Sequence, residues 1–226
     1  MKKSEILIDT LLVLAVLLSI FFYPYLPAQM ATHWDVHDNA NGYMSKFWGA
    51  FLMPIVMIVL TAMFMLIPKI DPLKKNIDKF RDEFEDFIAI LLFFFLVLHL
   101  QVLLWNYGIR INPSSIVPFA VGMLFYFIGT LLQKAKRNWF IGIRTPWTLS
   151  SDAVWDKTHK LGAILFRIAG ILAIAGSAFR GDAAMWFVMV PILSAVLICI
   201  IFSYIEFHKL EKSPVHHPKK VKAKKK

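Results

Sequence analysis

The chain has 226 residues, of which 58% are hydrophobic, and its mean hydropathy is +0.60. This composition excludes an ordinary water-soluble domain and is typical of a protein that lies mostly in lipid. The sequence has no phosphate-binding glycine loop, no HExxH and no GxSxG motif, so the enzyme classes that depend on them are not indicated. A single cysteine, Cys199, excludes an intramolecular disulfide.

Six apolar windows are long enough to cross a bilayer, for which a helix needs roughly 20 residues. These runs are too long and too continuous for barrel strands, and only helices satisfy their own backbone hydrogen bonds in lipid. We therefore predict an all-α, polytopic membrane protein with six transmembrane helices in residues 1–208, followed by a basic tail in residues 209–226. The windows are Thr10–Thr32, whose helix should end near Pro24, Phe47–Ile67, Phe87–Tyr107, Ile111–Gln133, Leu161–Phe179 and Ala183–Ile205.

The positive charges predict the orientation of these helices. Of the 25 Lys and Arg residues, 21 lie before the first window, in the loops after the second and fourth windows, or after the sixth window. Because Lys and Arg accumulate in cytoplasmic loops, both termini are predicted to be cytoplasmic and the protein to lie in the cell membrane. The net charge of +10 is therefore a topology signal. It predicts contact with membrane lipid and no nucleic-acid partner.

The loop after the first window, Tyr23–Lys46, is predicted to lie outside the cell. Two prolines should stop the preceding helix, and Asn41-Gly42 is a turn signal. The stretch HWDVHD, residues 33–38, holds groups that could bind zinc. Short His and Asp clusters are common in exposed loops, so we predict no metal and no cofactor. A metal-dependent membrane enzyme is the alternative that this stretch leaves open. The residues singled out here are His33, Trp34, an expected membrane-interface anchor, Asn41 and Lys46.

The segment between the fourth and fifth windows, residues 134–160, carries more chemistry than a connector needs. Pro146 restricts its own backbone and that of the preceding residue, so this turn should be stiff. Arg144 could hold an anionic group in bidentate fashion. Thr148, Ser150 and Ser151 offer capping hydroxyls for a helix that should begin around Ser151 and run into the fifth window. Two interpretations stay open, a preorganised binding site and a folding element. The candidate binding residues are Gly142, Arg144, Thr145, Pro146, Trp147, Trp155 and His159.

Two polar residues lie within the apolar windows. Arg167 is about 9 Å into the fifth window at 1.5 Å per residue, where an arginine costs ~2.5–3.5 kcal/mol. Asp9 and Glu206 lie near the same membrane side, so we predict an ion cluster of Asp9, Arg167 and Glu206. His99 in the third window is predicted to make an interhelical hydrogen bond. Roles of Arg167 and His99 in transport or proton relay are the alternative.

Two groups of residues resemble the SdpI family. Similarity to the family's N-terminal domain of unknown function rests on Leu26-Pro27, Trp34, Ser45-Lys46 and Pro54, with Ala31 where many relatives have proline. Its second signature resembles Ile141–Leu149 with Val154-Trp155 and Thr158-His159. The resemblance covers nearly the whole chain, with residues 1–68 as the N-terminal segment. It implies an integral membrane protein and not a known enzyme. The family includes bacterial proteins that give immunity to a secreted killing peptide and capture a cytoplasmic partner.

We therefore predict a non-catalytic membrane immunity or receptor protein of SdpI type, with a peptide toxin outside and a protein partner in the cytoplasm. The alternative is a small-solute or proton-coupled transporter. It draws support from the intramembrane Arg167 and His99. It also draws support from the layout, because two halves of three helices each would have opposite orientations, as in the inverted repeats of many transporters.

Overall fold

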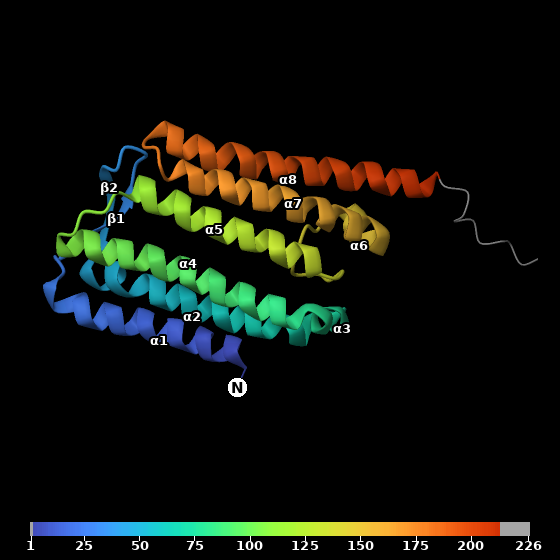
Figure 1. Cartoon of the computed structure of the whole chain (residues 1–226). Helices are drawn as coiled ribbons and strands as arrows, with labels where there is room; N and C mark the ends of the chain where they lie inside the picture. The colour runs from blue at the N-terminus through green and yellow to red at the C-terminus, as the bar shows by residue number, and fades with distance from the viewer. Residues whose placement is uncertain (1, 213–226) are drawn as a thin grey trace, which may run out of the picture.

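The computed structural model describes residues 2–212, and within them six long helices run side by side (Figure 1). All six are long and apolar enough to cross a membrane, which confirms the predicted class at this level. Residues 213–226, most of the predicted basic tail, lie outside the described residues. The long helices are α1 Lys3–Phe22, α2 Lys46–Ile70, α4 Arg81–Tyr107, α5 Pro113–Lys134, α7 Asp152–Gly176 and α8 Asp182–Glu211.

The short elements gather at the two ends of this bundle. At one end lie β1 Gln29–Trp34 and β2 Ala40–Ser45 (Figure 1). At the other end lie α3 Lys74–Ile77 and α6 Pro146–Ser150, together with the start of α1 and the end of α8 (Figure 1). Single 3-10 turns follow α1 and α3, at Tyr23–Tyr25 and Asp78–Phe80. The segments that connect the long helices therefore form two separate regions, one at each end of the bundle.

The β-hairpin corrects the all-α prediction. Strands β1 and β2 pair antiparallel, with an irregularity in the pairing between Ala31 and Trp34. Asn41-Gly42, predicted as the turn, lies inside β2, and the chain reverses instead around Asp38, which has a φ of 66°. Aspartate tolerates this left-handed conformation better than most residues. Burial along β2 alternates between half-buried and exposed residues only from Ala40 to Tyr43, and Met44 and Ser45 are exposed as well.

Glycines bring α5 and α7 into backbone contact. A Cβ added to Gly122 would lie 2.6 Å from the Gly170 carbonyl oxygen, and one added to Gly170 would lie 2.6 Å from that of Gly122. Only residues without a side chain permit this approach, which is the usual way in which helices associate in lipid. The α5–α7 pair is therefore a rigid centre for the second half of the chain.

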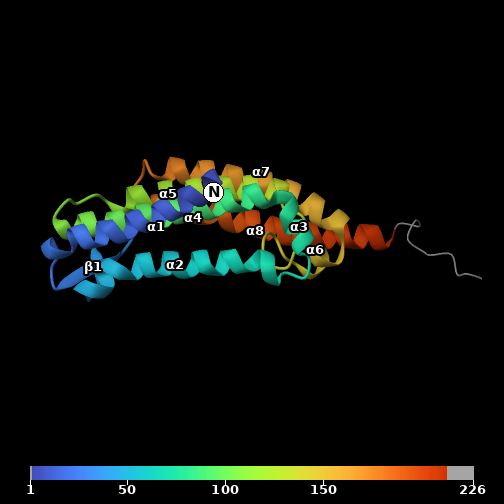
Figure 2. The ribbon, with the colours of Figure 1, turned by 90° about the horizontal axis from the view of Figure 1, so that it is seen from below.

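The two halves of the chain form two neighbouring groups of helices. α1, α2 and α4 lie together, and α5 lies beside α4 and leads into α7 and α8 (Figure 1). α1 and α8 lie at opposite faces of the bundle in Figure 1, and the turned view in Figure 2 shows α2 set to one side of the remaining helices. The seam between the halves runs between α4 and α5.

Candidate functional site

The tryptophan loop, residues 134–160, is organised by a buried pair of rings. Trp155 is fully buried and stacks on His159 with 4.0 Å between ring centroids. The indole Nε1–H of Trp155 donates to the Ala135 carbonyl oxygen at 2.9 Å. Ser151 caps α7 by accepting a hydrogen bond from the Val154 N–H, which confirms the predicted helix start. The pair therefore holds the beginning of α7 against the end of α5.

His159 uses both ring nitrogens within the fold. Its Nε2 accepts from the Ile143 N–H at 3.0 Å, so this nitrogen carries no proton. Its Nδ1–H then donates to the Trp155 carbonyl oxygen at 2.9 Å. Gly142 lies against this ring with a φ of +113°, and an added Cβ would overlap the His159 Nε2 atom. Gly142 and His159 thus act together in positioning the loop.

Two threonines build the corner that precedes α6. The Thr145 N–H donates to Thr148 Oγ1 at 2.9 Å, and the Thr148 N–H donates back to Thr145 Oγ1 at 3.1 Å. The Thr148 hydroxyl donates to the Ile143 carbonyl oxygen, and the Thr145 hydroxyl lies 3.0 Å from Ser203 Oγ on α8. Pro146 occupies the first turn of α6, where its missing N–H is not needed. Thr145 and Pro146 therefore have structural roles that bind the loop to α8.

Two residues that the sequence interpretation missed complete the loop. The buried Asn138 accepts from the N–H groups of Phe140 and Ile141 and donates to two carbonyl oxygens. Asp71, buried at the end of α2, accepts from the Trp139 N–H at 2.9 Å. A signal existed for both, since Asn and Asp close to helix ends favour hydrogen bonds to backbone. Asp71 ties the two loops at this end of the bundle together.

The exposed part of the tryptophan loop is cationic and aromatic. The Arg144 side chain is exposed, and its Nη1 donates to the Trp139 carbonyl oxygen at 2.7 Å. The Trp139 and Phe140 side chains are exposed beside it in the chain. Trp147 is half-buried and meets Tyr204 of α8 edge-on. We call Trp139, Phe140 and Arg144 the loop face. Among the predicted binding residues, Arg144 is the one that combines charge with exposure.

The predicted ion cluster of Asp9, Arg167 and Glu206 does not form. Arg167 donates to the Gln133 side-chain oxygen at 2.5 Å, so an amide of α5 takes the expected place of a carboxylate. Glu206 pairs instead with Lys157 and Lys209, at 2.6 and 2.8 Å. The physical reason is the arrangement of the helices, because α1, which carries Asp9, lies across the bundle from α8 (Figure 1). Proximity to one membrane side did not mean proximity in space.

His99 makes the predicted interhelical hydrogen bond. Its Nε2 lies 2.9 Å from Ser19 Oγ of α1, and that hydroxyl donates to the Ala50 carbonyl oxygen of α2. His99 is fully buried among these three helices. Arg167 lies in the other half of the chain with Gln133 as its partner. The structure therefore does not bring together the two polar groups on which a transport path was predicted.

The hairpin residues are fixed to neighbouring helices. Asp38 accepts from the N–H and hydroxyl of Ser114 at the start of α5, both at 2.7 Å. Asn106 of α4 makes two hydrogen bonds with the backbone of Ala31. Hydrogen bonds from Asn39 and the His37 N–H hold the pKa of the Asp35 carboxyl below its usual range. These contacts hold the hairpin as a fixed cap on this end of the bundle.

The other predicted outer-loop residues lie around this cap. His33 lies 2.6 Å from the Asn41 side-chain oxygen, and the Lys46 ammonium lies over the ring of Tyr23. Within residues 2–212, no group of three His, Cys, Asp or Glu residues is gathered as metal ligands would be. The carboxylates of the HWDVHD stretch are engaged instead with backbone and side chains of the hairpin and α5.

Trp34 lines a cavity of ≈ 260 Å³ between the hairpin, α5 and α8. Its ring meets Trp105 of α4 edge-on, with centroids 5.3 Å apart. The Trp34 Nε1–H is buried and has no hydrogen-bond partner within the described chain. Met185 and Met189 of α8 line the same cavity, and such side chains adapt to varied apolar partners. The lining is thus mostly apolar, with Asp35 and Ser114 as polar members, and a mostly apolar lining is typical of a ligand pocket.

Comparison with known proteins gives matches along most of the chain. Residues 134–203 match the SdpI/YfhL protein family, and residues 10–58 match a domain of unknown function, DUF1648. The immunity protein SdpI of Bacillus subtilis (strain 168) is 30% identical over 213 residues, which cover 94% of this chain and all of that protein. The uncharacterized membrane protein YbgB of the same organism is 42% identical over 45 residues, 20% of this chain and 50% of that protein. No solved structure matches significantly.

Proposed function

The chain belongs to the SdpI/YfhL family of multi-pass membrane proteins, and from this premise we propose that it protects its cell against a secreted peptide toxin without catalysing a reaction. The similarity to an immunity protein over that protein's whole length supports this proposal. The observation that carries it is the Trp34 cavity, which offers a mostly apolar wall on a fixed hairpin, with the unpartnered Trp34 N–H buried in the ring that lines it. Apolar side chains of a peptide could fill the cavity, and a peptide carbonyl group could accept a hydrogen bond from the Trp34 N–H once the lining side chains move aside to expose it.

The proposal places the hairpin outside the cell and the tryptophan loop inside. Support comes from the 21 of 25 Lys and Arg residues that belong to the tryptophan-loop side of the sequence. Cysteine introduced at Asn39 should therefore react with a membrane-impermeant reagent in whole cells, and cysteine at Ser150 should react only after the cells are opened. The native Cys199 is buried, so labelling of the unmodified protein gives the background signal. Reaction of both introduced cysteines in whole cells would contradict this orientation.

Trp34→Phe is expected to weaken protection while leaving the fold intact. Phenylalanine keeps the edge-on packing on Trp105 but removes the N–H donor, and a lost hydrogen bond to a partner corresponds to about 0.5–1.5 kcal/mol. The toxin concentration that halves growth should therefore fall by about 2–12-fold. Trp48→Phe is the matched control, because Trp48 is an exposed residue of the same end of the bundle. Equal protection by both variants would remove the cavity from the proposal.

For the opposite side, we propose that the loop face captures a cytoplasmic protein. Arg144 and the exposed aromatic rings beside it can hold an anionic, amphipathic surface without chemistry. Arg144→Ala should prevent a fluorescently tagged cytoplasmic partner protein from moving to the membrane when toxin is added. Lys160→Ala, which removes an exposed positive charge of the same loop, should leave this movement unchanged. If both variants lose it, net charge and not the loop face determines capture.

A further inference from the structure

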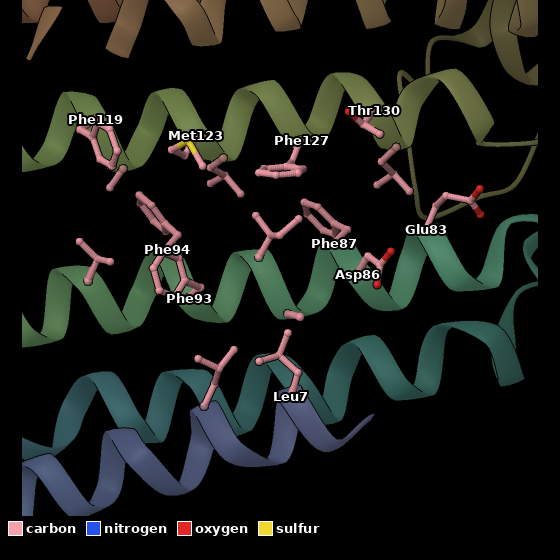
Figure 3. Close-up of a pocket in the computed structure, with 17 residues that line it drawn as sticks. Leu7, Glu83, Asp86, Phe87, Phe93, Phe94, Phe119, Met123, Phe127 and Thr130 are labelled. Carbon is pink, nitrogen blue, oxygen red and sulfur yellow. The ribbon is translucent and has the colours of Figure 1, made fainter. Parts of the chain in front are cut away.

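A narrow groove runs along the seam between the two halves of the bundle, lined by α1, α4 and α5. Figure 3 shows aromatic side chains of α4, among them Phe87 and Phe94, facing Phe119, Met123 and Phe127 of α5. Its volume is ≈ 390 Å³. The lining is apolar over most of its length, so the groove suits an apolar chain rather than water or a polar solute.

At the end nearest α3 the groove finishes in two carboxylates, Glu83 and Asp86 (Figure 3). Neither has an ion-pair partner within residues 2–212, although both lie in a region rich in Lys and Arg. The neighbouring Asp82 and Glu85, by contrast, both pair with Lys2. An apolar groove that ends in two unpaired negative charges is complementary to a molecule with an apolar tail and a cationic head.

The dimensions decide which kind of molecule fits. Along α4 the lining runs from Glu83 to Val97, about 21 Å at 1.5 Å per residue. A helix of that length and about 10–12 Å diameter would fill roughly 1,600–2,400 Å³, more than the ≈ 1170 Å³ of empty space in and around the groove. One leaflet contributes about half of the ~30 Å hydrocarbon core, so a single lipid chain spans most of this length. The groove therefore accommodates an acyl chain and not a peptide helix.

We propose that this groove binds one membrane phospholipid with a primary ammonium headgroup, of the phosphatidylethanolamine type. The acyl chain lies between the rings of α4 and α5, and the ammonium donates charge-assisted hydrogen bonds to Glu83 and Asp86. The bound lipid fills the seam between the two halves. An anionic lipid of the same chain length is disfavoured because its headgroup meets two negative charges.

Native mass spectrometry of the full chain tests this directly. The protein in detergent is titrated with phosphatidylethanolamine and with phosphatidylglycerol of identical acyl chains. The first lipid is expected to bind about tenfold more tightly, since two partly exposed ion pairs together supply about 1.4 kcal/mol. Equal or tighter binding of phosphatidylglycerol overturns the proposal. The proposal is also overturned if two copies of the chain associate through the seam and no lipid binds there.

Two matched pairs of variants locate the site. The double variant Glu83→Gln/Asp86→Asn should lose the preference for the ammonium lipid. Asp9→Asn removes an exposed carboxylate outside the groove, on α1, and should keep the preference. Met123→Trp fills the groove and should lower lipid occupancy about tenfold. Met63→Trp makes the same exchange at an exposed position of α2 and should have no effect. Unchanged binding in both Glu83→Gln/Asp86→Asn and Met123→Trp would place the lipid elsewhere and refute the proposal.

Discussion

Gly142→Ala is expected to lower the free energy of unfolding by about 2–5 kcal/mol. The φ of +113° costs an alanine about 1–2 kcal/mol. The added methyl group would also overlap His159 Nε2 and displace the ring from the Ile143 N–H that it accepts. The measurement is the melting temperature of the purified protein in detergent, followed by tryptophan fluorescence. We expect a fall of roughly 4–20 °C.

Gly108 provides the control for this substitution. It ends α4 with a similar φ of +110°, but an added Cβ would have no atom within 4 Å. Gly108→Ala should therefore show the backbone cost alone, about 1–2 kcal/mol. If the two variants melt at the same temperature, the contact between Gly142 and His159 does not stabilise the loop.

Trp155→Ala is expected to cost about 3–5 kcal/mol, the range for removing a large buried aromatic side chain. The change removes the stack on His159 and leaves the Ala135 carbonyl oxygen without its donor. The amount of folded protein recovered from membranes should fall, and the remainder should melt early. Size-exclusion chromatography with fluorescence detection measures both quantities.

Trp186→Ala is the matched control, because Trp186 is an exposed tryptophan of α8 within the same half of the chain. It should be recovered at the level of the unmodified protein. If both variants are recovered in equally low amounts, removal of any tryptophan lowers recovery, and the Trp155–His159 stack has no special role.

The sequence predicted the helices well because the requirement for them is local and strong. About 20 uncharged residues must form a helix in lipid, and Ser151 marked the start of α7 through its capping hydroxyl. The hairpin escaped prediction because the Asn41-Gly42 signal favours a turn. The two strands pair with each other, and Asn106 and Ser114, which lie far along the chain, attach the hairpin to α4 and α5.

The candidate site was harder to predict because it depends on which helices are neighbours. Arg167 could be placed in depth but not in direction, so its partner Gln133 on α5 could not be chosen over Glu206. His159 and Gly142 were recognised as a motif. Their role in folding follows from the stack of His159 on Trp155 and from the fit of Gly142 against the His159 ring, with Arg144 exposed nearby. Spacing alone does not distinguish these roles.

Survival of a sensitive cell is the most direct test of the proposed immunity. The chain is expressed in a bacterial strain that lacks its own immunity gene, and the strain is challenged with a secreted peptide toxin of the proposed kind. The account predicts growth at toxin concentrations that kill the strain carrying an empty vector. Death of cells whose membranes hold the folded protein at normal levels would contradict it.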